Sequence, residues 1–483
     1  MTSRTRAWVC AGMVLVLSGC GSSPATPPAA PGATPTPTTG VAAAPVSPAP
    51  QAAGSIAASS PSPTARPAWE AYTTPGFVGI PAVGPDGTFY ATVNSAKALW
   101  VIALDATGHM KAGWPYHTAD ADAYALTLGP DGTVFLATGG QTNATPGHVV
   151  ALDPAGQPKA GWPVATKSVP FAFKFGPDGT VYFAGTSGAD NRIYALEPDA
   201  SAKPGWPVAV PGTMETGFQL TPDGAVFVGQ FTQGQSSFTS HIYGYGPDGR
   251  RLLGWPLAAN DLESPTLAAD GTVYATSILT STRTVYAFDR TGKPVSGWHA
   301  AKLPGWPFAP TVAADGTLYV IVGLGPNMPN EIVALDSTGA LKPTWKPYTF
   351  ARALGQLPAV IAPSGDVVIP QSKMGANNMY VNGPDVVLGP NGRPLTAWPK
   401  SLVDSLGGPV FGPGGTAYVV SGAAVYAFAP DGSGVAGWPY RVPTGSTART
   451  IAVGSDGTVY VVEMGKGTSL IVALEPDGRP VGS

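Results

Sequence analysis

The chain has 483 residues, of which 11% are charged, and its formal net charge is −3 at pH 7. A slightly acidic chain offers no electrostatic basis for holding a phosphate backbone, so we expect no nucleic-acid partner. The 63 glycines and 53 prolines suit a fold of many short strands joined by tight turns.

Residues 1–19 have the pattern of a secretory signal peptide, because two arginines precede an apolar run over residues 7–17. This run is about half of the roughly 20 residues that a membrane-spanning helix needs. The ending Leu-Ser-Gly-Cys20 resembles the lipobox of bacterial lipoproteins. The resemblance implies lipidation of Cys20 and an extracytoplasmic chain anchored to a bacterial membrane, on the periplasmic side or at the cell surface. The alternative is an ordinary secretory peptide that is cut nearby.

The segment after Cys20 is almost wholly Ala, Pro, Ser, Thr and Gly. It has too little apolar surface to fold, and its prolines favour an extended chain. We therefore predict a lipoprotein signal peptide over residues 1–19, a disordered tether over 20–66 and a folded domain over 67–483. Since Cys10 lies within the signal peptide, no disulfide is expected in the mature chain.

A repeated phrase runs through the folded domain and is clearest in residues 126–163. It consists of an apolar stretch, Asp-Gly-Thr, an aromatic run, a variable gap, Val-x-Ala-Leu-Asp, x-x-Gly and Gly-Trp-Pro. The glycine of the A–B turn, which follows an aspartate in seven copies, marks nine copies that lie 42 to 50 residues apart. These glycines are Gly87, Gly132, Gly179, Gly224, Gly271, Gly316, Gly365, Gly415 and Gly457.

Each copy is predicted to form four strands, A to D, in chain order. Asp-Gly between two apolar runs is a strong hairpin signal, and it joins strands A and B. A four-stranded repeat of about 40–50 residues is typical of a propeller blade. We predict an all-β fold with a single closed β-propeller of nine four-stranded blades. The alternative is eight blades and one degenerate copy around residues 357–399.

A tryptophan follows strand C in eight of the nine copies, and the last copy lacks one. Trp69 lies 45 residues before Trp114, so it is in phase with the missing residue. We therefore expect the N-terminal segment to supply the outer strand of the last blade, which closes the ring and removes its open edges. Regular spacing assigns these side chains to packing between blades. The set is Trp69, Trp114, Trp162, Trp206, Trp255, Trp306, Trp345, Trp398 and Trp438.

The repeated phrase resembles the quinoprotein-type (PQQ-like) β-propeller repeat, which also contains Asp-Gly-x-Val-Tyr, Tyr-Ala-Leu-Asp, x-x-Gly and a tryptophan. The resemblance covers essentially the whole folded domain and implies its fold. Quinone-dependent members of that family commonly have an adjacent cysteine pair beneath the cofactor and a bound calcium ion. This chain has no cysteine after Cys20, so we expect no cofactor, neither PQQ nor calcium.

Metal and catalytic sites are not expected either. Each Asp-Gly turn offers one carboxylate where calcium needs several oxygens, and Asp120 with Asp122 is the nearest exception. His148 and His241 precede strand C in two copies that are not adjacent, so a zinc site or an acid–base pair is not expected. We assign no catalytic residue and no metal ligand.

The B–C and D–A connections differ between copies in length and composition, whereas the A–B and C–D turns are short and uniform. Both variable connections lie on one face of a propeller, and loops on a rigid frame usually carry function. Four charged residues stand eight to ten positions before their turn glycine, close to the channel mouth. Asp122, Glu215, Glu263 and Arg449 are therefore candidate ligand-binding residues, with solvated rim residues as the alternative.

These features favour binding over catalysis. We expect a membrane-tethered binding or assembly scaffold, monomeric as a propeller, that contacts a protein or glycan partner through the variable face. The propeller lipoprotein subunit of outer-membrane protein assembly machinery is similar in having both a lipobox and this type of repeat. The alternative function is an enzyme, either a quinone-dependent oxidoreductase or a propeller-type lyase.

Overall fold

The structure is a computed structural model. It describes residues 67–482 except 96–97, 119, 121, 140–146, 168, 188–189, 234–237, 260–261, 263–264, 278–282, 301, 326–327, 352–357, 375–379, 401 and 404–407. The predicted signal peptide, the lipidation site Cys20 and the tether lie outside the described residues. Apart from one 3₁₀ turn, η1 (Pro413–Gly415), the described elements are β-strands. The described part contains no helix long and apolar enough to cross a bilayer.

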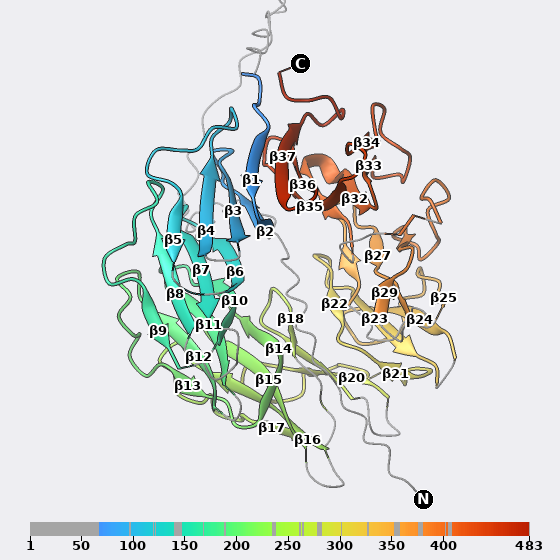
Figure 1. The fold of residues 1–483 in the computed structure, drawn as a ribbon. Helices are drawn as coiled ribbons and strands as arrows, with labels where there is room; N and C mark the ends of the chain where they lie inside the picture. Colours follow the sequence, from blue (N-terminus) through green and yellow to red (C-terminus); the bar gives the residue numbers. More distant parts are fainter. Residues whose placement is uncertain are drawn as a thin grey trace, which may run out of the picture. The chain divides into compact units, whose positions relative to one another are not determined.

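Nine antiparallel sheets follow one another along the chain as the blades of a propeller (Figure 1), which confirms the predicted fold and blade number. The first four are regular, each strand pairing with its neighbour in sequence. Blade 1 contains β2 (Phe77–Val83), β3 (Phe89–Ser95), β4 (Ala98–Leu104) and β5 (Tyr116–Thr118); blade 2 contains β6 (Asp122–Leu128), β7 (Val134–Gly139), β8 (Gly147–Leu152) and β9 (Val164–Thr166). Blade 3 contains β10 (Val169–Phe175), β11 (Val181–Ser187), β12 (Asp190–Leu196) and β13 (Val208–Ala209); blade 4 contains β14 (Thr213–Leu220), β15 (Val226–Gln233), β16 (Phe238–Tyr245) and β17 (Leu257–Ala259).

Blades 5 to 8 are less regular, and their innermost strands shrink to two residues. Blade 5 contains β18 (Thr266–Leu267), β19 (Val273–Thr276) and β20 (Val285–Phe288); blade 6 contains β21 (Trp306–Pro307), β22 (Thr311–Val312), β23 (Leu318–Gly323), β24 (Asn330–Leu335) and β25 (Tyr348–Phe350). Blade 7 contains β26 (Val360–Ile361), β27 (Val367–Ile369) and β30 (Val386–Leu388), with a separate hairpin of β28 (Ser372–Met374) and β29 (Tyr380–Asn382). Blade 8 contains β31 (Val410–Phe411), β32 (Ala417–Ser421), β33 (Ala424–Phe428) and β34 (Tyr440–Arg441). The copy suspected of being degenerate is therefore blade 7.

Blade 9 combines the two ends of the folded domain. It contains β35 (Thr447–Val453), β36 (Val459–Met464), β37 (Thr468–Leu474) and, as its outer strand, β1 (Tyr72–Pro75). β1 and β37 are antiparallel, with Tyr72 opposite Ile471, and they lie side by side in Figure 1. One core cluster then contains side chains of both blade 9 and blade 1. The predicted closure through the N-terminal segment is confirmed.

Most blade tryptophans pack against an aromatic residue near the start of strand B in the same blade, whereas Trp398 of blade 7 packs on Phe428 of blade 8. Trp162 and Phe135 illustrate the pair, with ring centroids 5.7 Å apart in an edge-to-face arrangement. The indole Nε1 of Trp162 also donates to the backbone oxygen of Pro198 in blade 3, at 3.3 Å. Hydrogen bonds of this kind tie blade to blade. They run from Trp114 to Pro154, from Trp206 to Pro247, from Trp255 to Arg290 and from Trp438 to Pro476.

In blade 5 this position is held by Trp298 and not by Trp306, which corrects the predicted set. Trp298 packs on Tyr274 with ring centroids 5.3 Å apart. Trp306 instead lies in β21, which pairs with β23 of the next blade, and its ring is 5.0 Å from the guanidinium carbon of Arg283. The Gly-Trp-Pro triplet at Trp306 matches the repeated phrase but lies out of register with it. The match to the motif therefore selected the wrong tryptophan.

In five blades the glycine before the tryptophan marks a close approach to the next blade. Gly161 has φ +84°, and a Cβ there would overlap the backbone oxygen of Asp199 in the next blade. Since this approach recurs at Gly113, Gly205, Gly254 and Gly437, the Gly-Trp dipeptide is a device for joining blades.

Candidate functional site

The face that carries the A–B and C–D turns, here the turn face, uses its acidic residues to hold the turns. In blade 2, Asp131 accepts hydrogen bonds from the backbone N and the hydroxyl of Thr133, at 3.1 and 2.8 Å. The ammonium of Lys159, from the C–D side, reaches the same carboxylate at 3.2 Å. Equivalent Asp–Thr–Lys groups occur in blades 1, 3 and 6. They are Asp86 with Thr88 and Lys111, Asp178 with Thr180 and Lys203, and Asp315 with Thr317 and Lys342.

These contacts keep the turn carboxylates ionised. The hydrogen bond from the Lys203 ammonium is the main cause that lowers the pKa of Asp178 to about 2. At Asp315 the backbone and hydroxyl of Thr317 do the same, and the pKa again lies at about 2. These aspartates therefore hold the turns as carboxylates whose negative charge is already paired within the protein. Within the described residues, no group of three or more His, Cys, Asp or Glu side chains is placed to hold a metal ion.

The opposite face carries the B–C and D–A connections and is called the loop face. Its connections differ from blade to blade: β15 and β16 extend to eight residues each, and Gln371–Gly383 contains the extra hairpin. Much of the predicted variable stretch Gly139–Gly147 lies outside the described residues. The described blades thus differ most where function was expected.

The four predicted ligand-binding residues are only partly described. Asp122 is the first residue of β6 and is half-buried. Arg449 lies in β35 at a shift in register, is exposed, and places its guanidinium carbon 4.8 Å from the centre of the Phe77 ring of blade 1. Glu215 lies in β14, but its side chain is not among those described, and Glu263 lies outside the described residues. Asp122 and Arg449, both described, are not joined by a hydrogen bond or ion pair.

A second group at the loop face brings together Asp120 and His148, which the sequence analysis considered separately as possible metal ligands. Asp120 Oδ2 lies 3.1 Å from His148 Nδ1 and accepts a hydrogen bond from the hydroxyl of Thr138. His241, which lies within β16, strand C of blade 4, has its Nδ1 2.7 Å from the amide nitrogen of Gln230. Each imidazole therefore has its partner within or next to its own blade, in blades 2 and 4, and the structure does not bring the two together.

A buried acid between blades 8 and 9 was not predicted. Glu463, in β36, is 1% exposed and accepts a hydrogen bond of 2.5 Å from the hydroxyl of Tyr440, in β34. Burial raises the pKa of Glu463, and burial together with the nearby carboxylate raises the pKa of Tyr440. A signal was available in the fifth residue of strand B, which is polar in several copies, including Thr138 and Gln230.

Asp385, in blade 7, was also missed. Its side chain is 5% exposed, and burial raises its pKa to about 7. One oxygen accepts from the backbone N of Gln371 at 3.3 Å, while the other oxygen and the Gln371 amide nitrogen have no partner in the part of the chain that the structure describes. The other eight blades have Val or Ile at this position, each at most 1% exposed. They are Val101, Val149, Ile193, Ile242, Val285, Ile332, Val425 and Ile471.

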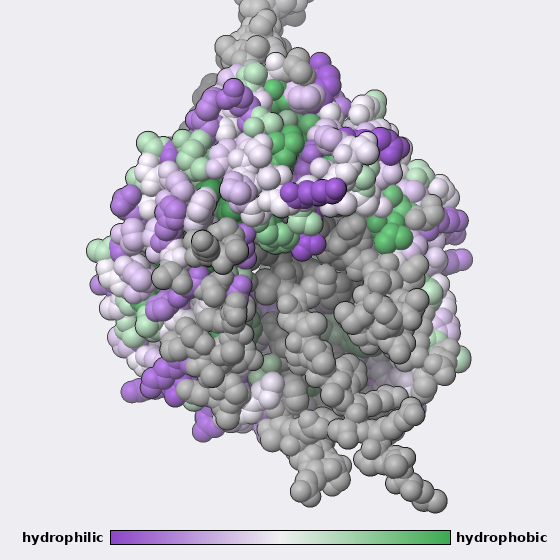
Figure 2. All heavy atoms as spheres, viewed as in Figure 1, coloured by the Kyte–Doolittle hydropathy of each residue, from purple (hydrophilic) through white to green (hydrophobic). Residues whose placement is uncertain are grey.

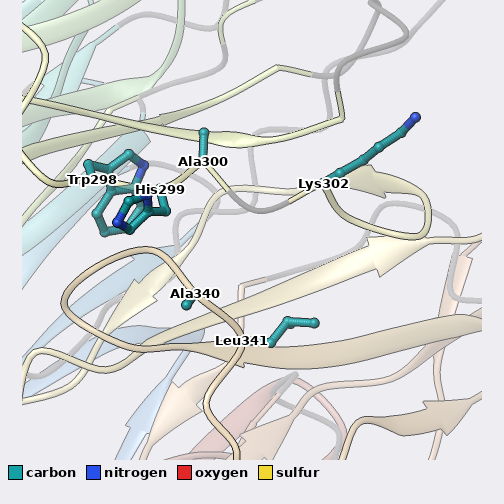
Figure 3. Close-up of a pocket in the computed structure, with 6 residues that line it drawn as sticks. All are labelled: Trp298, His299, Ala300, Lys302, Ala340 and Leu341. Carbon is teal, nitrogen blue, oxygen red and sulfur yellow. The ribbon is translucent and has the colours of Figure 1, made fainter.

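An open groove lies between residues of blades 5 and 6 (Figure 3). Its lining comes from the segment after strand C of blade 5 and from the C–D turn of blade 6. The lining residues are Trp298, His299, Ala300, Lys302, Ala340 and Leu341. Here the Trp298 indole donates within its own blade, to Val285 O at 2.9 Å, and not to the next blade. At this joint the tryptophan therefore does not make the hydrogen bond to the next blade that Trp162 makes.

Apolar surface is scattered. In the view of Figure 2, hydrophobic residues form small patches between hydrophilic ones. The large hydrophobic side chains that are most exposed are Leu253, Met328 and Leu341, from three different places in the chain. Single exposed apolar residues are normal on a soluble surface and indicate no docking patch by themselves.

No family model and no curated protein matches this sequence. Many solved structures resemble it in fold. One described as the eukaryotic initiation factor has 14% identity over 78% of this chain and 90% of that chain, with a TM-score of 0.50. The Dos1 propeller has 12% identity over 84% and 94%, with a TM-score of 0.43, and a virginiamycin B lyase from Staphylococcus aureus has 17% over 60% and 92%, with a TM-score of 0.33. Identities this low concern the fold alone. The chain is a β-propeller repeat protein.

Proposed function

We propose that this protein is a lipid-anchored extracytoplasmic binding or assembly scaffold, and that its loop face contacts a protein or glycan. The observation that carries the proposal is the contrast between the two faces. On the turn face, the repeated Asp, Thr and Lys side chains are bonded to one another and hold uniform turns. On the loop face, the connections vary, and Arg449 presents an exposed guanidinium.

Arg449 is well suited to such a contact. Its guanidinium stacks on Phe77, so part of its conformational freedom is already lost before a partner binds. Arginine and aromatic residues are enriched among the few residues that dominate binding energy at protein interfaces. The pair also joins blade 9 to blade 1, at the point where the ring is closed.

The test uses the mature chain immobilised through its tether and exposed to solubilised membranes of the source organism. We expect quantitative mass spectrometry to find a species enriched by the wild-type chain and lost with Arg449→Glu. Arg250→Glu is the matched control, because the Arg250 side chain is 89% exposed and lies in a C–D turn on the opposite face. Equal capture by both variants would contradict the assignment to the loop face, and absence of any enriched species would contradict the scaffold. Turnover of an alcohol or sugar after addition of quinone and calcium would favour the enzymatic alternative.

A further inference from the structure

The wall of the central channel is formed by the innermost strands, and one position on them faces the next blade. This position lies five residues before the turn glycine. In blade 5 the hydroxyl of Thr266 donates to Pro310 O of blade 6 at 3.0 Å, and in blade 6 the hydroxyl of Thr311 donates to Ala359 O of blade 7 at 2.7 Å. A side chain at this position therefore lies between two neighbouring inner strands.

The residues at this position divide the ring into two arcs. Blades 2 to 6 carry polar side chains, which are Thr127, Lys174, Gln219, Thr266 and Thr311. Blades 7, 8, 9 and 1 carry the apolar residues Val360, Val410, Ala452 and Ala82. The polar arc is continuous, because β6, β10, β14, β18 and β22 contact one another in that order. A ring built only for packing would not need this division.

Lys174 is the only charged member of the polar arc. It lies in β10 opposite Tyr182 of β11, and Tyr182 belongs to the core cluster shared by blades 3 and 4. The lysine side chain is half-buried, and burial alone lowers its pKa, with no acidic group acting against this shift. Among the described residues, no hydrogen-bond or ion-pair partner of the ammonium is found. Partial burial of an unpaired cation is unfavourable, so a bound anion would stabilise the ammonium at this position.

The backbone beside Lys174 is unusual. Ala172 has φ +54°, in the left-handed region that residues other than glycine seldom adopt. The register shift between β10 and β11 at this point recurs in blades 1, 2, 4 and 9, so the torsion, and not the shift, is particular to this blade. On the neighbouring inner strand β14, Gly217 has φ +117°, and a Cβ on it would lie 3.2 Å from the Ala172 Cβ. Strained residues and β-bulges concentrate at functional sites, where they redirect side chains. Both features occur within two to three residues of this level of the wall.

We propose that the wall between β10 and β14 is an anion-binding site, in which the Lys174 ammonium pairs with a carboxylate or phosphate group of a small molecule in the channel. The neighbouring Gln219 offers an amide donor at the same level of the next strand. An anion would supply the counter-charge that none of the described side chains provides. The site lies on the channel wall and does not depend on the loop-face proposal.

The first experiment measures binding of citrate and of inorganic phosphate to the folded mature chain by titration calorimetry, with sodium chloride holding the ionic strength constant. We expect one site per chain for at least one of the two anions, and the better ligand distinguishes carboxylate from phosphate recognition. Lys174→Met should weaken this binding at least about tenfold, whereas Lys293→Met, on an exposed turn, should leave it unchanged. Failure of both anions to bind the wild-type chain, or equal binding by Lys174→Met, would overturn the site.

A second experiment keeps the proposal testable if Lys174→Met fails to fold. Lysines of the wild-type chain are acetylated with a limiting amount of reagent. Mass spectrometry then measures the rate of acetylation at each lysine with and without the anion. We expect acetylation of Lys174 to slow at least about threefold when the anion saturates the chain, while acetylation of Lys293 stays constant. Unchanged acetylation of Lys174 would contradict its contact with the anion.

Discussion

At the scale of single residues, the protein buries two acids in its core. Asp385 occupies a position where the other blades have Val or Ile, and one of its oxygens is buried without a partner among the described residues. Glu463 is as deeply buried but accepts a hydrogen bond from the hydroxyl of Tyr440. Burying a polar group is tolerable when a hydrogen bond is formed and unfavourable when it is not. The two acids should therefore affect stability differently.

Asp385 should make the protein less stable as the pH rises. Its pKa is raised from 3.8 to about 7 in the folded chain, so between these values the folded chain keeps a proton that the unfolded chain has lost. The free energy of unfolding then falls with rising pH, by up to about 1.4 kcal/mol for each pH unit crossed, and levels off above the folded pKa. Urea unfolding between pH 5 and 7.5 measures this decline. Asp385→Val and Asp385→Asn should both flatten the curve, and a wild-type slope in either variant would exclude Asp385 as its origin.

The blade tryptophans should contribute strongly to stability. Trp162 is 7% exposed and joins blade 2 to blade 3 through both its ring and its Nε1. We expect Trp162→Ala to lower the free energy of unfolding by about 3–5 kcal/mol. Leu253→Ala, at a residue that is 91% exposed, should change it by less than about 0.5 kcal/mol. Chemical denaturation of both variants compares them directly, and similar small losses would remove the structural role from Trp162.

At the scale of elements, joints between blades depend on backbone approaches that allow no side chain. Gly161 and Gly132 form a matched pair in blade 2, because their φ values are +84° and +80°. A Cβ at Gly161 would overlap the Asp199 carbonyl, whereas a Cβ at Gly132 meets nothing within 4 Å. Any difference between alanine variants at these two positions therefore reports the contact between blades.

We expect both alanine variants to lose about 1–2 kcal/mol from the left-handed backbone. Gly161→Ala should lose about 1–3 kcal/mol more, because the neighbouring turn has to move. Thermal and urea unfolding give the two losses. If Gly132→Ala is as destabilising as Gly161→Ala, the close approach is not what requires glycine in the Gly-Trp dipeptide.

The elements also show what a sequence can and cannot reveal about this protein. Nine hairpins were predictable because Asp-Gly recurs in register, and the closing strand because Trp69 is in phase with the later tryptophans. Trp306 misled because it stands in a better match to Gly-Trp-Pro than Trp298, although only Trp298 follows Asp289 by the nine residues seen in other copies. The left-handed torsion of Ala172 could not be predicted from the sequence, because it depends on the packing of β10 against β14 in the next blade. The lack of an acidic partner for Lys174 among the described residues could not be predicted either, because it depends on which side chains surround it in the folded chain.

At the scale of the whole molecule, ring closure depends on a short N-terminal strand. β1 covers the outer edge of β37, and Glu70 N donates to Thr107 O of blade 1 at 2.8 Å. Removing residues 67–76 should expose an unpaired strand edge, lower the unfolding temperature and promote self-association. Light scattering and calorimetry measure these effects. Removal of residues 21–60 is the control, and an equal loss in that variant would contradict a specific role for β1.

The most direct measurement of the central claim is hydrogen–deuterium exchange of the mature chain with and without the partner captured from membranes. We expect slower exchange in loop-face peptides, above all around Arg449 in β35 and Asp120 before β6. Exchange in the A–B turns on the opposite face, such as the turn around Gly132, should stay unchanged. Protection confined to those A–B turns would contradict a scaffold that works through its loop face.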